Sequence, residues 1–383
     1  MAGILLVAIN LRASITAVGP IVSEIRADLG LSNAEAGLLT TLPVLAFAFA
    51  SPVANPLSRR IGMERTLAGA LVLLLAGILL RITGTTAAAF IGTGMLGVAI
   101  AAGNVLLPAL ARRDLPRRVG AVTSAYVTLM VGFAGIASTV SVPLAEDLGL
   151  GWKGALAVWA IPVVAGLLLW LPRVFRARPD RENPSIDRPP PTRLRRSPIA
   201  WQVTAYMGLQ SFAFYVLVAW FPELLQDDGV SAPVAGVLMG VMQFSSLAAT
   251  IAVPVLATRA RDQRGLVLGS TALGLFAMFG LLIAPGELAL LWTVSIGLAG
   301  ACTLSLSLAF FVLRTRDGAD AAALSGMAQS IGYGFAAIGP FVIGALHDAT
   351  DGWTWPVVVF IAVWAGIGVA GVLAGRARVI GES

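Results

Sequence analysis

Residues 5–20 read LLVAINLRASITAVGP, an apolar segment with a single charge, Arg12, at its centre. A charge at mid-bilayer depth costs about 2.5–3.5 kcal/mol on insertion scales, so such residues face the interior of a helix bundle or a wet cavity. No acidic residue lies in the same segment. Because a buried cation needs a compensating anion, we expect the anion at Arg12 to be cargo.

The composition is that of a membrane protein. Of the 383 residues, 57% are hydrophobic and 12% are charged, whereas a soluble domain carries about 25% charged residues. Many apolar stretches reach the length of about 20 residues that a helix needs to cross a bilayer. We therefore predict an all-α integral membrane protein whose partner is the lipid bilayer. The twelve transmembrane helices are expected at roughly 2–27, 34–57, 66–82, 86–111, 119–145, 152–172, 198–225, 232–257, 266–284, 288–313, 321–346 and 354–375.

Most of the positive charge, 22 of the 26 Lys and Arg residues, lies in one set of loops. Arginine-rich segments follow the expected helices that end at residues 57, 111, 172, 257, 313 and 375, while the alternate loops are acidic. By the positive-inside rule the arginine-rich loops are cytoplasmic. We expect both termini in the cytoplasm and a multi-pass protein of the cell inner (plasma) membrane. The net charge of +6 comes from these loops and does not indicate a nucleic-acid partner.

The start of the chain carries no sign of a cleavable signal peptide. The first apolar run has no basic segment before it and no small-residue cleavage site after it. Because this run begins almost at Met1, we expect the native N-terminus to extend further.

The two halves of the chain repeat one another. Residues 31–39 (LSNAEAGLL) and 230–238 (VSAPVAGVL) open the second and eighth helices, and a Gly-Trp pair opens the sixth and the twelfth. Between the halves lies a polar segment rich in arginine and proline, which is typical of a flexible linker. We expect an N-terminal six-helix bundle over 1–172, a cytoplasmic linker over 173–197 and a C-terminal six-helix bundle over 198–383. Two such pseudo-repeat bundles resemble the major facilitator fold, in which cargo binds between the halves.

The first helix also resembles a particular branch. Asn10, Arg12 and residues 16–20 are similar to the helix 1 signature of the cyanate/2-nitroimidazole permease family of the major facilitator superfamily, although Ala13 and Ala17 replace its usual proline and serine. The resemblance covers essentially the whole chain and implies small anionic or polar cargo. The other segments that agree with the family are 39–44, 108–113, 219–222 and 326–333.

The loop over residues 55–65 occupies the position of the superfamily's helix 2–3 signature. The resemblance implies a gating role for Arg59, Arg60 and Arg65. The aspartate that usually precedes the first arginine is Ser58 here, which puts a latch based on that carboxylate in doubt. The alternative is that these arginines only set the topology.

Arg12 offers five donors in a fixed fork, which suits carboxylate-like or linear anions. Thr16 lies one turn later on the same face and is expected to donate to the same ligand. The alternative is that Arg12 bonds the carbonyls of a helix broken near Pro20. Polar side chains deep in other spans are further candidates for substrate binding, each with packing, capping or interfacial anchoring as its alternative. They are Asn104, Tyr126, Gln210, Gln243, Gln329 and Tyr333.

Several functional classes are excluded. One cysteine, Cys302, and one histidine, His347, provide neither an intrachain disulfide nor a His/Cys metal centre. There is no nucleotide-binding loop and no catalytic triad, so we expect no enzyme activity, no catalytic residue and no cofactor. No Asp or Glu is central in any span, so uniport or exchange fits better than proton coupling at the midplane.

We predict a secondary active or facilitated transporter that works by alternating access, as a monomer, with Arg12 as the central anion anchor. Its cargo is expected to be a small anion or polar nitrogenous solute that is cyanate-like, nitrate/nitrite-like or nitroimidazole-like. The alternatives are broad-specificity efflux of drugs or metabolites and a non-transporting membrane sensor. Arg12→Ala should stop anion transport, only weaken efflux of neutral drugs and leave a sensor intact.

Overall fold

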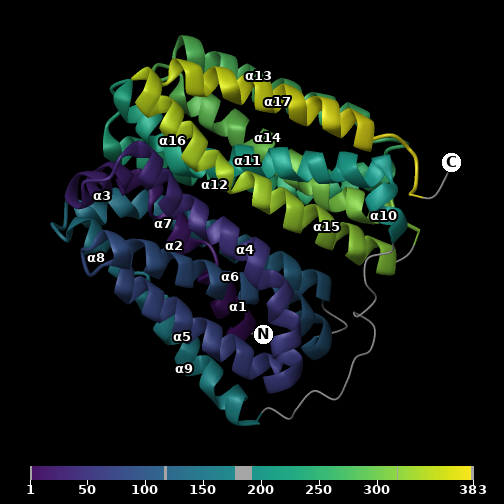
Figure 1. Ribbon diagram of the computed structural model, residues 1–383, viewed down its shortest axis with the longest axis horizontal. Coiled ribbons are helices and arrows are strands. Elements are labelled where there is room, and N and C mark those ends of the chain that lie inside the picture. The colour runs from purple at the N-terminus through teal and green to yellow at the C-terminus, as the bar shows by residue number, and fades with distance from the viewer. Residues whose placement is uncertain (1, 116–118, 177–191, 317, 381–383) are drawn as a thin grey trace.

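The computed structural model describes residues 2–115, 119–176, 192–316 and 318–380 (Figure 1). Within those ranges every regular element is a helix and no strand is present. Twelve helical stretches there are long and apolar enough to cross a membrane. The prediction of an all-α protein with twelve spans is confirmed.

The N-terminal half contains ten helical elements between residues 2 and 176 in the described ranges, nine α-helices and one 3₁₀ turn. They are α1 (Ala2–Ile9), α2 (Ala13–Thr16), the 3₁₀ turn η1 (Gly19–Ile21), α3 (Val22–Leu29), α4 (Asn33–Ile61), α5 (Met63–Arg81), α6 (Thr86–Asp114), α7 (Val119–Ala145), α8 (Gly151–Ala157) and α9 (Ala160–Arg176). The C-terminal half follows the same plan. It comprises α10 (Thr192–Arg196), α11 (Pro198–Asp227), α12 (Ala232–Arg259), α13 (Arg264–Ile283), α14 (Ala289–Leu313), α15 (Gly318–Ala336), α16 (Ile338–Thr350) and α17 (Thr354–Ala374).

Three spans that the sequence predicted as continuous helices are interrupted. The interruptions follow Thr16, Ala157 and Ala336. A proline stands four or five residues after each, at positions 20, 162 and 340. Because proline has no N–H, it cannot bond the carbonyl one turn earlier. At the first interruption the Ser138 hydroxyl replaces that donor and bonds the Thr16 carbonyl at 3.1 Å.

The first span has a second interruption, which places Arg12. Residues 10–12 form a turn between α1 and α2, where one continuous helix over 2–27 was predicted. The buried Asn10 amide donates to the Leu6 carbonyl at 2.7 Å and to the Pro162 carbonyl at 3.2 Å. The Asn10 backbone N–H turns to the Val7 carbonyl instead. A side chain that takes over a helical acceptor favours this kind of break, so Arg12 opens a new short helix.

Buried apolar side chains form two clusters, one drawn mainly from each half of the chain. Figure 1 shows the purple and blue helices in one bundle and the green and yellow helices in the other. The bundles are joined by α4, which packs on α15 and α16, and by α7, which packs on α12. Tyr215 and Tyr333 pack against both clusters. These two tyrosines therefore lie at the boundary between the halves.

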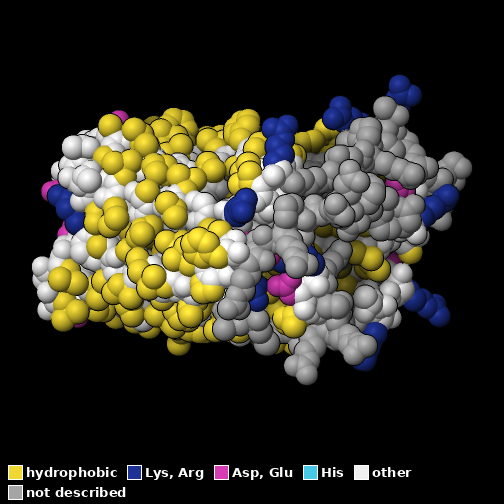
Figure 2. Space-filling model, turned by 90° about the horizontal axis from the view of Figure 1, so that it is seen from below, with side chains coloured by type: hydrophobic (Ala, Val, Ile, Leu, Met, Phe, Trp, Pro, Cys, Tyr) yellow, Lys and Arg dark blue, Asp and Glu magenta, His cyan; other side chains and the backbone are white. Residues whose placement is uncertain are grey.

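The surface divides into an apolar flank and two polar ends. Hydrophobic side chains cover much of the described flank in Figure 2. We call the end that carries Arg60, Arg113, Arg173, Arg264 and Arg314 the arginine-rich end. The opposite end carries Asp28, Glu223, Asp227 and Asp348 and is called the acidic end.

Close packing inside the C-terminal bundle gives a stability prediction. A methyl group at Gly274 would lie 2.2 Å from the ring of the buried Trp364. We expect Gly274→Ala to cost about 1–3 kcal/mol through overpacking and to lower the melting temperature in detergent. Gly269→Ala is the matched control on the same helix, because nothing lies within 4 Å of its added methyl. Equal melting temperatures for the two variants would contradict this packing.

Candidate functional site

Arg12 stands at the break between α1 and α2, half-buried inside the protein. Its backbone carbonyl is used by the chain, since it accepts from the N–H groups of Ile15 and Thr16. Its guanidinium carbon lies 5.1 Å from the centre of the Phe214 ring on α11. Among the described residues, no carboxylate pairs with this guanidinium and no acceptor bonds it. The donors of Arg12 are therefore available to a ligand.

Aromatic rings from both halves form a connected group that begins beside this arginine. Phe214 contacts Tyr215 edge-on with centroids 5.2 Å apart, and Tyr215 contacts Tyr333 at 6.4 Å. Phe47 on α4 completes the group, 6.2 Å from Tyr333. The charge of Arg12 acts electrostatically on both tyrosines. We call Phe47, Phe214, Tyr215 and Tyr333 the aromatic cluster. It joins Arg12 of one half to three side chains of the other.

Arg81 supports the short helix that carries the site. This side chain is buried and donates from Nη1 to the Ser14 carbonyl at 2.9 Å. Its Nε and Nη2 atoms have no hydrogen-bond partner in the described part of the chain. Ser14 lies in α2, two residues beyond Arg12. Arg81 thus holds α2 by its backbone.

Thr16 and Tyr333 have different relations to Arg12. Tyr333 belongs to the aromatic cluster, so the structure brings this predicted residue to Arg12. The Thr16 hydroxyl instead lies 3.0 Å from the Ala134 carbonyl of α7, which can accept its proton. Thr16 is buried and joins the broken first span to α7. The structure shows no contact between its hydroxyl and the guanidinium of Arg12.

The predicted residues Asn104 and Tyr126 lie in the N-terminal half, like Arg12, on α6 and α7. Asn104 is exposed and shares its side with the exposed Pro108, four residues later. The apolar residue Val98 is also exposed, but it lies about 120° away around the helix. Asn104 and Val98 therefore lie on different sides of α6. Tyr126 is buried and packs in the N-terminal cluster.

The three predicted glutamines differ in how their amides are satisfied. Gln210 is buried and donates to the Ser211 hydroxyl at 2.7 Å and to the Met207 carbonyl at 3.2 Å. Gln329 donates to the Ser325 hydroxyl at 2.6 Å. Gln243 is buried on α12, and its amide nitrogen has no partner among the described residues. It shares a helix side with Gly236 and Gly240, which approach α7 of the other half.

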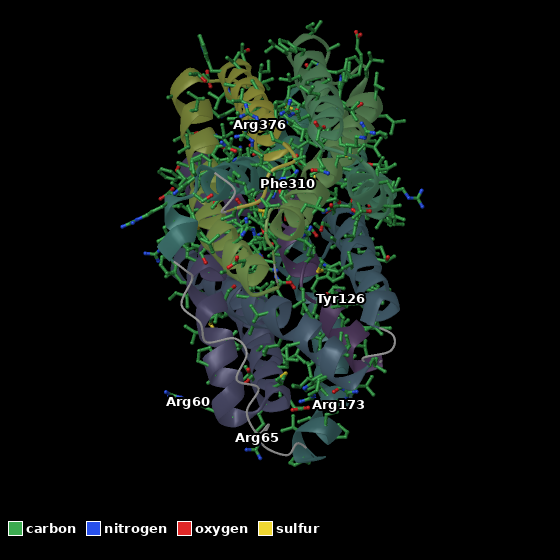
Figure 3. All side chains as sticks on the ribbon, turned by 90° about the vertical axis from the view of Figure 1, so that its right-hand side faces the viewer. Arg60, Arg65, Tyr126, Arg173, Phe310 and Arg376 are labelled. Atoms are coloured by element: carbon green, nitrogen blue, oxygen red, sulfur yellow. The ribbon has the colours of Figure 1, made fainter. Side chains whose placement is uncertain are left out.

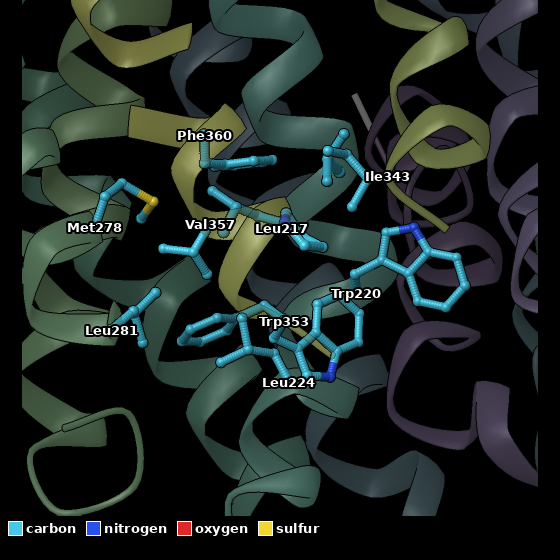
Figure 4. A pocket seen from close by; sticks show the side chains of 12 residues that line it. Leu217, Trp220, Leu224, Met278, Leu281, Ile343, Trp353, Val357 and Phe360 are labelled. Atoms are coloured by element: carbon cyan, nitrogen blue, oxygen red, sulfur yellow. The ribbon is translucent and has the colours of Figure 1, made fainter. Parts of the chain in front are cut away.

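A separate small pocket lies within the C-terminal half near the acidic end (Figure 4). Every residue that lines it is hydrophobic, among them Trp220, Met278, Trp353 and Phe360. The two indole N–H groups are already used, by the Pro340 carbonyl and the Asp227 carboxylate. The pocket therefore offers no free polar group to orient a charged or polar cargo.

Comparison with known proteins identifies the family. The model of the Major Facilitator Superfamily matches residues 4–337. The chain belongs to the major facilitator superfamily. The fold agrees, since the structure of the nucleoside transporter NupG (D323A mutant) superposes with a TM-score of 0.78 at 12% identity, over 98% of this chain and 99% of that one.

Three relatives place this major facilitator protein within the superfamily. It is 46% identical to the uncharacterized transporter YycB of Bacillus subtilis (strain 168), over 100% of this chain and 94% of that protein. It is 40% identical to the 2-nitroimidazole transporter of Escherichia coli (strain K12), over 99% and 96%. It is 28% identical to the cyanate transport protein CynX of the same organism, over 90% and 89%. The resemblance to cyanate/2-nitroimidazole permeases is confirmed, and the protein is a multi-pass membrane transporter of small-molecule solutes rather than an enzyme.

The superfamily's helix 2–3 loop lies at the arginine-rich end. Arg60 and Arg65 are exposed, and Figure 3 shows them at the edge of the N-terminal bundle that points away from the C-terminal bundle. The side chain of Arg59 lies outside the described residues. The buried carboxylate of this loop, Glu64, pairs with Arg113 of the same half. Partial burial opposes the charge of Arg113, but Glu64 and Asp114 outweigh it and raise the pKa of Arg113.

The C-terminal half repeats this arrangement with an amide. Gln263 stands where the repeat places Glu64, and its side-chain oxygen accepts from Arg314. Burial lowers the pKa of the Arg314 guanidinium, an effect that Asp262 partly offsets. Arg314 also donates to the Ala374 carbonyl at 2.6 Å. Each half therefore ties its own arginine-rich end together.

Sequence reasoning overlooked several members of the site. Phe47, Arg81, Phe214 and Tyr215 were not among the expected site residues. Phe214 lies one helical turn after the candidate Gln210, so its spacing was a signal that could have indicated it. Arg81 could have been found by its charge at the end of an apolar span. Phe47 and Tyr215 carry no such signal, because aromatic residues are common in apolar helices for packing alone.

Proposed function

We propose that this major facilitator protein carries a small anion or polar nitrogenous solute, with Arg12 as the central anchor of the cargo. The observation that carries the proposal is a guanidinium at a helix break, between the two halves, with no carboxylate partner in the described residues. The relatives named for cyanate and for 2-nitroimidazole transport support this cargo class.

The cargo would bind between the Arg12 fork and the aromatic cluster. Two N–H groups of a guanidinium can donate in parallel to one flat or linear acceptor. The guanidinium lies over the Phe214 ring at cation–π distance. Tyr333 supplies a hydroxyl from the other half. We propose Thr16, Asn104, Tyr126, Gln210, Gln243 and Gln329 as outer contributors, reached by rearrangement where their groups are now bonded to the chain.

We propose that the conformation is the one open toward the cytoplasm. The four hydrogen bonds between the halves in the described residues, involving residues 26–34 on one side and 223, 347 and 348 on the other, lie at the acidic end. If the arginine-rich end is cytoplasmic, as the positive-inside rule predicts, the closed end faces outward. The exposed Asn104 then faces the inner opening. Arg59, Arg60 and Arg65 would act when that opening closes.

The aromatic cluster favours a second candidate function, the transport of neutral flat aromatic compounds. Four connected rings, one of them beside Arg12, supply stacking surface that does not depend on the charge of the ligand. In that case Arg12 would serve mainly as a hydrogen-bond donor or as a structural residue.

Ligand binding to the purified transporter tests the proposal. We would measure thermal stabilisation and calorimetric binding with cyanate, thiocyanate, nitrate, nitrite, small carboxylates and 2-nitroimidazole. We expect an anion or nitro compound to bind the wild type and to lose its effect in Arg12→Ala, while Arg195→Ala, an exposed control, binds normally. Binding only of neutral aromatics, unchanged in Arg12→Ala, would reject the anchor in favour of the second candidate.

A further inference from the structure

The acidic ends of the two halves are built on the same plan. In the N-terminal half the Trp152 indole donates to Asp28 at 3.0 Å. In the C-terminal half the Trp353 indole donates to Asp227 at 2.7 Å. Each tryptophan stands at the start of the last span of its half, and each aspartate stands near the end of the first. These matched bonds define which residues correspond in the repeat.

One corresponding pair of carboxylates has different partners. A glutamate precedes each aspartate by four residues, Glu24 in one half and Glu223 in the other. Glu24 accepts the Trp152 backbone N–H at 3.0 Å and so braces its own half. Glu223 instead pairs with Arg26 of the opposite half. A position that is internal in one repeat therefore connects the two bundles in the other.

The surroundings of Glu223 make this connection dependent on charge. Its side chain is only 5% exposed, against 28% for Arg26. One of its carboxylate oxygens is buried with no hydrogen-bond partner in the described part of the chain. The neighbouring Asp227 repels it, and His347 lies close enough to attract it when protonated. A buried carboxylate left without its cation is strongly unfavourable. The acidic end can therefore close over an ionised Glu223 only when Arg26 pairs with it.

Other residues at the acidic end also join the two bundles, along the boundary that we call the seam. The Asp348 carboxylate accepts from the Asn33 amide at 2.6 Å and from the Ala34 backbone N–H at 3.1 Å. The Asn33 amide also lies 3.1 Å from the His347 ring. These contacts set the two bundles in register. Arg26–Glu223 is the one ion pair between the halves within the described residues.

We propose that the Arg26–Glu223 pair is the latch that holds the acidic end shut and sets how often the transporter opens there. When the halves separate, both side chains return to water and the ion pair is lost. The latch therefore favours the closed acidic end whatever solute is carried. Glu24 has no such effect, because its bond stays within one half.

A cysteine reporter below the seam tests the latch. Ala36 on α4 is fully buried and packs in the hydrophobic cluster of the opposite half. Ala36→Cys in a Cys302→Ser background should react with a membrane-impermeant maleimide only when the acidic end opens. Labelling of intact cells and of inverted vesicles in parallel shows which side this end faces. The labelling rate in each variant is compared with total labelling after denaturation.

We expect Glu223→Gln and Arg26→Gln each to raise the labelling rate about tenfold, within the usual range of conformational coupling. Glu24→Gln, the matched control, should leave the rate within about twofold of the parent. The exchanged pair Arg26→Glu with Glu223→Arg should bring the rate back toward the parent value. This rescue separates a charge effect from general loosening of the fold.

The latch would be rejected by unchanged labelling in Glu223→Gln and Arg26→Gln. It would equally be rejected if Glu24→Gln raised the rate as much as Glu223→Gln, or if the exchanged pair remained as open as the single variants. None of these results depends on the identity of the cargo, so the proposed function and the latch can fail separately.

Discussion

Arg12→Ala is expected to lower transport of an anionic substrate by at least about 100-fold. Each hydrogen bond to a charged group contributes about 1.5–3 kcal/mol, and the Arg12 fork can make two to one anion. Because about 2.8 kcal/mol corresponds to a factor of 100, loss of both reaches that effect. Initial rates of uptake into proteoliposomes would measure it.

Two further variants separate the roles of charge and geometry at Arg12. Arg12→Lys keeps the charge but not the planar fork, so we expect an intermediate loss of about tenfold. Phe214→Leu removes the ring 5.1 Å from the guanidinium and should weaken transport less than Arg12→Ala does. Arg195→Ala serves as the control for loss of an exposed arginine. Transport by Arg12→Ala within threefold of wild type would make Arg12 a structural residue.

Gly19→Ala is expected to stop the transport cycle with the acidic end unable to close. Its added methyl would lie 2.3 Å from the Val218 carbonyl on α11 of the other half. A backbone carbonyl inside a helix cannot turn away, so the bundles must separate. If the conflict disfavours the closed state by about 2.8 kcal/mol or more, its relative population falls by at least about 100-fold. Transport rate and ligand binding should be measured together, because we expect turnover to fall much further than binding.

A glycine that faces open space provides the control. Gly94 lies on α6 of the same half, and nothing lies within 4 Å of an added methyl there. Gly94→Ala should transport normally. Methyl groups added at Gly37 and Gly344 would also meet the opposite half, at 2.5 Å from the Pro340 carbonyl and 2.6 Å from the Asn33 carbonyl. Normal turnover in Gly19→Ala would show that this contact is not needed for the cycle.

The number and type of spans were predictable from the sequence. A backbone in lipid must satisfy its own hydrogen bonds, so twelve apolar stretches of sufficient length predict twelve helices. Arg12 was also recognisable as a candidate site residue, because a lone charge at that depth is costly and is read by default as a functional-site hypothesis. Neither inference requires knowing which helices touch. A helix broken near Pro20 was only an alternative interpretation, since one continuous helix over 2–27 was predicted.

Side-chain partners across the bundle were decided only by the tertiary structure. The pattern of apolar residues predicts the length of a helix. A helix that is apolar around its whole circumference, however, does not show which of its faces meets which neighbour. Gln210 was an equally good pocket candidate until its amide was seen to bond its own helix. Glu24 and Glu223 occupy equivalent positions in the repeat, and one braces its own half while the other pairs with Arg26. The difference arises because each contact depends on how the two bundles dock, and docking joins residues about 200 positions apart in the chain.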